Sequence, residues 1–349
     1  SHSDVSLIDD PGGESKVHQG VTTEVTGNCA YSPFPSGIAG PKKLQQSLGS
    51  TLHGDEVWDW TTLEGWANRI ESNGVSINIA PLVGHSALRI SAGAVDDRPP
   101  TSDELSEMQR LARDSIEQGA FGMSTGLNYS PSCYADVNEI VTLVNAIKGY
   151  ENVFYASHAR VWAGWHFRAL EELIEVGRQS GIAVQYSHLA IIDPRQHGRA
   201  KEMMGIIDQA RSEGIDATAD VYPYTAAGTS LAALIPDWMS EGGVDSLLRR
   251  LREPKLRQKA RTEMENGWFR GLPWDWDSLV VSHVSTDANR SLVGMSLSSV
   301  SESRKTNPMD TLLDLIDEEN NHVSVVAHNR TEEDMRIFLA HPQSMIGSD

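Results

Sequence analysis

The sequence predicts an α/β protein in which parallel strands close into a (β/α)₈ barrel. Short apolar runs of β type alternate with helical patterns along all 349 residues, and no linker or low-complexity block interrupts them. The alternation amounts to eight β/α steps, the number of a closed barrel rather than of an open sheet. Two dipeptides, Ser157-His158 and Ser187-His188, each end an apolar run, at the position where such barrels carry their functional groups.

The unit that contains these dipeptides is the clearest part of the pattern. An apolar run over 153–156 and another over 183–186 flank the helical stretch Ala169–Gly177. A strand–helix–strand unit of this length forms a right-handed crossover, so its two strands are parallel neighbours. We therefore expect His158 and His188 side by side at the carboxyl edge of the sheet, as two metal ligands would be.

The remaining elements follow in chain order. Two helices end before a glycine that suits the left-handed conformation, Asp103–Gln118 before Gly119 and Lys201–Glu213 before Gly214. A further strand is expected at the N-terminus, ending near His2. The other expected strands are Val21–Thr26, Ser76–Leu82, Phe121–Thr125, Val153–Ser157, Ala183–Ser187, Ala217–Val221 and Ser344–Gly347.

The stretch 235–329 departs from this alternation. It contains two extra strand-like runs, Leu279–Val284 and Val323–Ala327, among helical patterns. We interpret it as an insertion over the mouth of a single barrel that spans residues 1–349.

The composition is that of an ordinary soluble globular protein, with 39% hydrophobic and 22% charged residues. A formal net charge of −19 argues against nucleic acid or an anionic membrane as a partner, because both require a basic face. No apolar run reaches the length of a membrane span, and no signal-peptide pattern opens the chain. Two cysteines are too few for a disulfide framework, which favours a reducing, cytoplasmic setting. Nothing in the sequence indicates an oligomeric state.

Six polar residues fall at expected strand ends, and their types are those of a hydrolytic metal site. Such a site needs two to four ligands and a carboxylate that can take a proton from water. Cys29 follows a strand, which favours a ligand over a small buried hydrophobe, whereas Cys133 lies in a Pro/Ser-rich loop and is expected to be structural. The candidates are His2, Asp4, Cys29, His158, His188 and Asp349.

Six sequence blocks resemble the N-acyl-D-amino-acid deacylase (D-aminoacylase) family of the amidohydrolase superfamily. No single block is decisive, but all occur in the family's order and together they cover essentially the whole chain. The blocks are Gly20–Thr23, Gly27–Cys29, Ala80–His85, Gly122–Leu127, Asp220–Tyr224 and Met345–Asp349.

The resemblance implies a distorted (β/α)₈ barrel of the metal-dependent hydrolase type, with a small β-sandwich made from both chain ends. The chain opens on Ser1 without a methionine and stops just after a strand-like run. We therefore expect a segment of a longer protein, from which the flanking sandwich is missing.

The resemblance also implies the roles of the site residues. Cys29, His158 and His188 would hold a tightly bound zinc, and His2 would serve a second, weaker metal position. Asp349 would act as general base in the hydrolysis of a C–N amide bond of a small molecule. The oxyanion of that reaction would be assisted by His85 or Tyr222, although each of these can equally be a structural residue.

Two departures from the family concern recognition of the metal and of the substrate. The first strand reads His2-Ser3-Asp4, where the family usually has His-x-His. Asp4 can ligate zinc, so the second metal position is either kept in altered form or lost. The family commonly places a lysine at the position of Ala190, where it helps to hold the substrate carboxylate, and alanine has neither charge nor donor.

A third departure follows His158. Arg160 is present as in the family, but Trp162 and Trp165 stand where acidic residues are usual. Two tryptophans at a barrel mouth indicate an apolar substrate wall, to which Arg160 and Tyr224 would add contacts, or they pack under the insertion. The expected function is thus a deacylase whose chemistry is kept and whose substrate is more apolar.

Two alternatives stay open. A cyclic-amide hydrolase of the dihydroorotase or hydantoinase type usually bridges two metals with a carboxylated lysine on the fourth strand, and the run 121–126 has no lysine. A non-catalytic binding protein on a decayed barrel is suggested by Asp4 and Ala190. Retention of the cysteine, the two histidines and Asp349 argues against decay.

Overall fold

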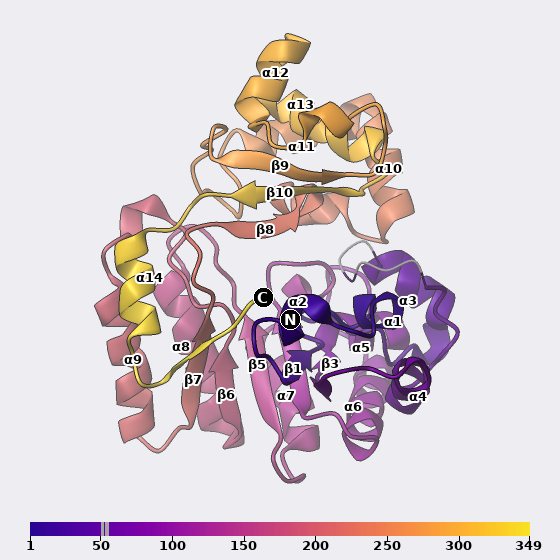
Figure 1. The fold of residues 1–349 in the computed structure, drawn as a ribbon, viewed down its shortest axis with the longest axis vertical. Helices are drawn as coiled ribbons and strands as arrows, with labels where there is room; N and C mark the ends of the chain where they lie inside the picture. Colours follow the sequence, from indigo (N-terminus) through magenta and orange to yellow (C-terminus); the bar gives the residue numbers. More distant parts are fainter. Residues whose placement is uncertain (50–51, 53–55) are drawn as a thin grey trace.

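The computed structural model describes residues 1–49, 52 and 56–349, and its centre is a parallel β-sheet (Figure 1). The six hydrogen-bonded strands follow the order β11-β7-β6-β5-β4-β3, and each neighbouring pair is parallel. The crossover unit predicted around the two Ser-His dipeptides is confirmed, because β5 and β6 are parallel neighbours. The bounds are β3 Val83–Gly84, β4 Gly122–Gly126, β5 Phe154–His158, β6 Ala183–Tyr186, β7 Ala217–Val221 and β11 Ser344–Ile346.

Two further parallel strands, β1 (Thr23–Thr26) and β2 (Asn78–Pro81), extend this sheet. Only Leu82 separates β2 from β3, and its N–H donates to the Thr26 carbonyl at 3.0 Å, so the two ladders continue into each other. In the parts of the chain that the structure describes, no ladder joins β11 to β1. The α/β architecture with a parallel sheet is thus confirmed, whereas closure into a barrel stays a prediction.

The predicted strands agree with the observed ones where an apolar or β-branched run is bounded by turn residues. Ala217–Val221, Leu279–Val284 and Val323–Ala327 coincide with β7, β9 and β10. Ser1–Ser3 lie outside regular structure, although the Ser1 amino group donates to the Val25 carbonyl of β1 at 3.2 Å. The strand expected to end near His2 therefore stays a prediction.

Helices cover the parallel sheet in a row in which α5, α6, α7, α8, α9 and α14 contact one another in turn (Figure 1). α6 buries residues at spacings of three and four, and its N-terminus is capped by reciprocal hydrogen bonds between Thr101 and Glu104. No helix in the described ranges has both the length and the apolar character needed to span a membrane. The bounds are α1 Ser6–Asp9, α2 Glu14–Val17, α3 Pro41–Leu48, α4 Leu63–Asn73, α5 His85–Ala92, α6 Ser102–Glu117, α7 Val137–Ile147, α8 His166–Ser180, α9 Ala200–Ser212 and α14 Glu332–Leu339.

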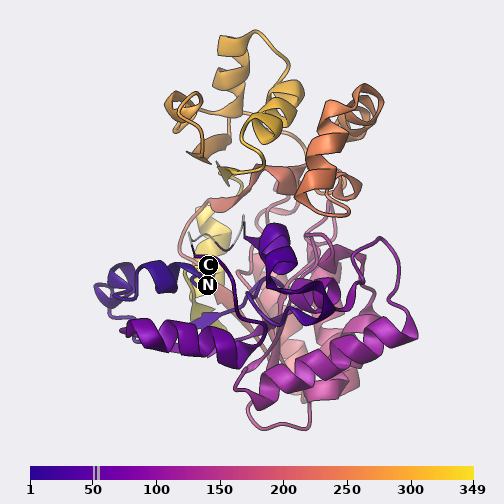
Figure 2. The ribbon, with the colours of Figure 1, turned by 90° about the vertical axis from the view of Figure 1, so that its right-hand side faces the viewer.

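A second layer stands apart from the helix-covered parallel sheet and has a hydrophobic core of its own (Figures 1 and 2). Its antiparallel sheet has the order β8-β10-β9, and Leu234, Leu313 and Val325 are among the side chains that fill its core. β8 has no counterpart among the predicted strands, because its Ala-Gly-Thr-Ser sequence carries little strand signal. The bounds are β8 Ala227–Ser230, β9 Leu279–Val284, β10 Val323–Ala327, α10 Val244–Arg252, α11 Pro254–Met264, α12 Leu297–Arg304 and α13 Pro308–Glu318.

A buried carboxylate ties two elements of this second layer together. Glu319, which follows α13, accepts hydrogen bonds from the backbone N–H groups of Ser285 (2.6 Å) and Thr286 (2.8 Å), just after β9. The side-chain amide of Asn289 donates to it at 2.6 Å. Burial raises the pKa of Glu319, but the hydrogen bonds from Thr286, Asn289 and Ser285 lower it more, to about 2. The ionised carboxylate therefore stabilises the second layer.

We predict that Glu319→Gln lowers the free energy of unfolding by about 1–3 kcal/mol at pH 7, because charged hydrogen bonds are replaced by weaker ones. A carboxyl group whose pKa is lowered in the folded state contributes fully above its unfolded value of about 4.5 and loses this contribution as the pH falls toward about 2. Urea unfolding of both proteins at pH 7 and pH 3 measures the difference.

The exposed Glu302 on α12 provides the control, and Glu302→Gln is expected to change stability by less than about 0.5 kcal/mol. A Glu319→Gln protein that is as stable as the parent at pH 7 would contradict the role of this carboxylate.

Candidate metal centre

Three predicted ligands converge at the carboxyl edge of the parallel sheet. Cys29 follows β1, His158 ends β5 and His188 follows β6. Their ligand atoms all lie within 4.8 Å of one another, with Cys29 Sγ 3.3 Å from His188 Nε2. The imidazole rings of His158 and His188 meet edge to face, with centroids 4.5 Å apart. All three side chains are buried.

The turns that carry Cys29 and His188 are held in an unusual backbone conformation. Both residues have left-handed φ values, 52° and 41°, which cost a non-glycine residue free energy unless the surroundings enforce them. The backbone N–H of His188 donates to the Asp220 carboxylate on β7 at 2.7 Å. The Ser187 hydroxyl donates to the Asn28 side-chain oxygen at 3.1 Å, which connects the two turns directly.

Strand β4 makes room for the turn that carries Cys29. Gly126, opposite His158 in the ladder, lies so close to this turn that an added Cβ would be 2.2 Å from the Cys29 carbonyl oxygen. The Ser124 hydroxyl accepts a hydrogen bond from the Ala30 N–H at 3.1 Å. The Gly122–Leu127 block of the sequence thus contributes backbone space and hydrogen bonds, not ligands.

The electrostatics of the three residues suit a metal ion. Burial lowers the pKa of His158 and of His188, so both imidazoles are neutral at neutral pH and carry a free lone pair. Both ring nitrogens of His158 are buried and have no hydrogen-bond partner in the described parts of the chain, an arrangement that a bound metal would satisfy. Burial raises the pKa of the Cys29 thiol, so binding would displace its proton. Two nitrogens and one sulfur form a donor set typical of zinc.

A second group of candidate ligands adjoins the first. His2, Cys29 and Asp349 have ligand atoms within 4.8 Å of one another, and His2 Nε2 lies 3.5 Å from Asp349 Oδ1. Burial raises the pKa of Asp349, but His188 and His2 lower it more, so the carboxylate stays ionised. The Cys29 thiol is therefore shared between the two groups.

Asp4 belongs to neither group among the described residues. Its side chain is fully buried, its carbonyl accepts a hydrogen bond from the Trp66 indole at 2.8 Å, and burial raises its pKa to about 6. Both carboxylate oxygens of Asp4 are buried and have no hydrogen-bond partner among the described residues, and a role for Asp4 at the second metal position stays a prediction.

A cavity of about 400 Å³ lies between the strand ends and the second layer, and the candidate ligands line its floor. Tyr222, Tyr224 and Ala190 also line it, at the positions where the sequence places substrate contacts. Burial raises the pKa of Tyr222, so its hydroxyl keeps its proton and can donate. Small residues of β8 and β10 cover the opposite side, namely Ala227, Gly228, Thr229, Ser230, Ser324 and Ala327.

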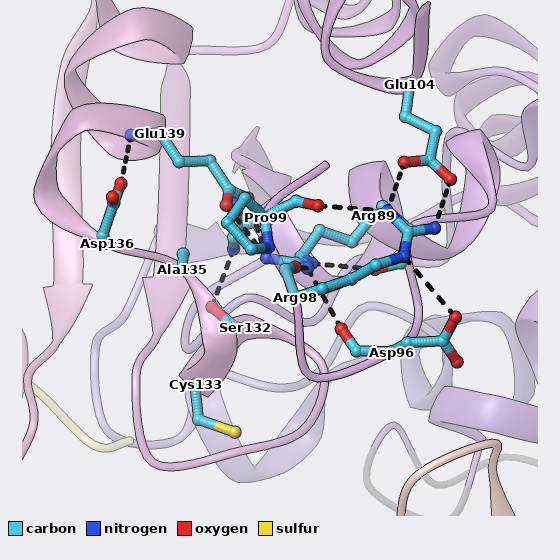
Figure 3. A network of polar contacts seen from close by, with 12 residues as sticks. Arg89, Asp96, Arg98, Pro99, Glu104, Ser132, Cys133, Ala135, Asp136 and Glu139 are labelled. Atoms are coloured by element: carbon cyan, nitrogen blue, oxygen red, sulfur yellow. Dashed lines mark hydrogen bonds and ion pairs between the residues drawn. The ribbon is translucent and has the colours of Figure 1, made fainter. Parts of the chain in front are cut away.

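His85, which was expected to assist at the oxyanion, does not line this cavity and lies inside the fold. Its ring is fully buried, with Nδ1 2.8 Å from the Ser132 hydroxyl and Nε2 3.0 Å from the Glu139 carboxylate. Arg89 donates to both oxygens of Glu139 at 3.0 Å, in the network that Figure 3 shows. Both ring nitrogens of His85 are thus used inside the fold.

Three expected substrate contacts, Arg160, Trp162 and Trp165, also do not line the cavity. The Arg160 guanidinium donates to Glu172 at 2.9 Å and to the Cys133 carbonyl at 2.9 Å. The tryptophans pack against each other, and arginines lie over their rings. The apolar wall consists instead of Val161, Ile192, Trp268 and Phe269.

The cavity residues that the sequence-based site lacks include Tyr31, Tyr129, Tyr186 and Arg330. Tyr129 packs against His158, with ring centroids 4.6 Å apart. Tyr186 immediately precedes the Ser187-His188 dipeptide, so its place at a strand end was a usable signal. Arg330 follows β10 at the end of the expected insertion, where no periodic pattern marks it.

Comparison with solved structures identifies proteins of the same α/β fold. A crystal structure described as a D-aminoacylase that defines a novel subset of amidohydrolases superposes with a TM-score of 0.76 at 27% identity, over 100% of this chain and 63% of that one. An N-acyl-D-glutamate deacylase from Bordetella bronchiseptica, complexed with zinc and a phosphonate inhibitor, has the same fold, with a TM-score of 0.78 at 24% identity. It matches 99% of this chain and 62% of that one.

Sequence comparison identifies relatives with a named activity. An N-acyl-D-aspartate deacylase and an N-acyl-D-glutamate deacylase, both from Alcaligenes xylosoxydans xylosoxydans, are each 32% identical to this chain. The matches extend over 231 and 230 residues, which is 66% of this chain and 45% and 46% of the relatives. No protein-family model matches the chain. The chain is thus related to the N-acyl-D-amino-acid deacylases, as the ordered sequence blocks predicted, and it spans about half the length of these relatives.

We predict that Cys29→Ala lowers zinc affinity by at least about 100-fold, since even the loss of a partner outside the ligand set costs ~10–100-fold. Elemental analysis of protein dialysed against a weak chelator measures the zinc retained per chain. Cys133→Ala is the control, because Cys133 is also a free, buried cysteine but does not line the cavity. Equal zinc content in the two variants would exclude Cys29 from the ligands.

Proposed function

We propose that this chain is the catalytic part of a zinc-dependent hydrolase that cleaves a C–N amide bond. It would act as an N-acyl amino acid deacylase or a close relative with a more apolar substrate. The supporting observation is the Cys29, His158 and His188 cluster on the floor of the cavity, beside the ionised Asp349. The named relatives support the same chemistry.

A zinc held by Cys29, His158 and His188 would polarise the amide carbonyl and make water acidic enough to react at neutral pH. Asp349, which follows β11, lines the same cavity and is ionised, so it can accept the proton of the attacking water. Once protonated, it can return that proton to the leaving nitrogen. The Tyr222 hydroxyl is a donor for the oxyanion that develops on the carbonyl.

The cavity walls support a small substrate with an apolar part. Val161, Ile192, Trp268 and Phe269 contribute apolar surface, and the second layer keeps bulk water from the floor. We further propose that the parallel sheet closes into a barrel, that residues 235–329 are an insertion over its mouth, and that His2 serves a second, weaker metal position. A cytoplasmic location remains a prediction from the cysteine content.

We predict that Asp349→Asn lowers kcat by at least about 100-fold on N-acyl-D-amino acids with apolar side chains, because the amide cannot accept a proton. Zinc content should stay near that of the parent protein. Single-turnover kinetics together with elemental analysis measure both quantities.

The exposed Asp59 allows a matched control, since Asp59→Asn should leave kcat and zinc unchanged. If Asp349→Asn retained full turnover, Asp349 would not be the base. If the parent protein hydrolysed no amide, the proposed function itself would be wrong.

A further inference from the structure

The Arg330 guanidinium lies in the cavity and forms no hydrogen-bonded ion pair through Nε or Nη1 in the described parts of the chain, although Asp349 attracts its charge. It lines the cavity and sits over the ring of Tyr222, 4.0 Å from the centroid. Its Nε and Nη1 atoms are buried and have no hydrogen-bond partner in the described parts of the chain. Asp349, which lines the same cavity, pairs with His2 instead. Because a buried, unpaired cation is costly, this arrangement indicates an anion that enters with a ligand.

The position of Arg330 is set in advance of any ligand. Its backbone N–H donates to the Thr225 carbonyl at 3.2 Å, which joins the segment after β10 to the loop between β7 and β8. The ring of Tyr222 supports the plane of the guanidinium from one side. Burial lowers the pKa of Arg330, yet an arginine with this environment stays charged at neutral pH. The donors therefore need little reorganisation when an anion binds.

A second donor without a hydrogen-bond partner among the described residues lines the same cavity. The Tyr186 hydroxyl, at the end of β6, is buried and has no hydrogen-bond partner among the described residues. Tyr186 lines the same cavity as Arg330. Its hydroxyl can therefore be satisfied by an acceptor from a ligand or from water.

We propose that Arg330 and Tyr186 together bind a carboxylate of the substrate, so that the cavity selects amides that carry a negative charge. This inference rests on the proposed function and adds the group that recognises the substrate. A guanidinium with two unused N–H positions and a phenol offer the donors that a carboxylate accepts. Among the described residues that line the cavity, Arg330 is the one lysine or arginine, and Ala190, Ile192 and Trp268 offer no charge.

Equilibrium binding tests this inference without any turnover. Asp349→Asn protein serves as the background so that the ligand is not consumed, and isothermal titration calorimetry measures Kd for N-acetyl-D-leucine and for its neutral amide, N-acetyl-D-leucinamide. The expected result is tighter binding of the carboxylate than of the amide. Arg330→Met should weaken carboxylate binding by at least about tenfold and leave amide binding unchanged.

Two further variants keep the test decisive. Tyr186→Phe removes only the hydroxyl and should weaken carboxylate binding about three- to tenfold, even if Arg330→Met does not fold. Arg336→Met, on the exposed face of α14, is the matched control and should change neither Kd. The inference is wrong if Arg330→Met or Tyr186→Phe leaves the ratio of the two Kd values unchanged.

The outcomes separate this inference from the proposed function. With Asp349 intact, turnover of N-acetyl-D-leucine by the zinc-loaded protein tests the hydrolase. If the Arg330→Met protein still hydrolysed the carboxylate in preference to the neutral amide, the anion site would be wrong and the proposed hydrolase would stand. The opposite outcome is a parent protein that hydrolyses no amide while Arg330→Met loses carboxylate binding. That result would support the anion site and overturn the enzyme.

Discussion

The hydrogen-bonding register of the parallel strands determines where the functional side chains of this protein meet. Ser157 on β5 pairs with Thr125 on β4 and with Tyr186 on β6, so the three strands end at the same level. His158 and His188 leave the sheet together at this level, opposite the turn that carries Cys29. A shift of one strand by one residue would turn an imidazole to the other face and separate the three groups.

Residues that do not reach the cavity still determine its shape. His85 and the Gly126 N–H both contact the Ser132 hydroxyl, and Arg160 holds the Cys133 carbonyl. These bonds fix the loop after β4, whose Tyr129 packs against His158. Sequence blocks that resemble a family thus identify residues that matter without saying whether they touch the substrate or support those that do.

Much of the floor of the site could be predicted from the sequence, and little of its walls. Cys29, His158 and His188 follow strands, and parallel strands bring their carboxyl ends to one edge, so pattern alone places these three residues together. The direction of Trp162 and Trp165 depends on how a loop packs under the second layer, which no periodicity encodes. Arg330 comes from the segment after β10, and its approach to Tyr222 is set only by the tertiary fold.

The distance along the chain between the ligands has a consequence for assembly. Cys29 and His188 are 159 positions apart, yet their side chains are 3.3 Å from each other. An unfolded chain rarely brings such positions together, so it offers no preformed site, and a metal that binds here binds the folded form almost alone. By mass action, the free metal concentration in the surroundings then becomes part of what keeps the chain folded. Scarcity of such an ion would then shorten the lifetime of the folded chain.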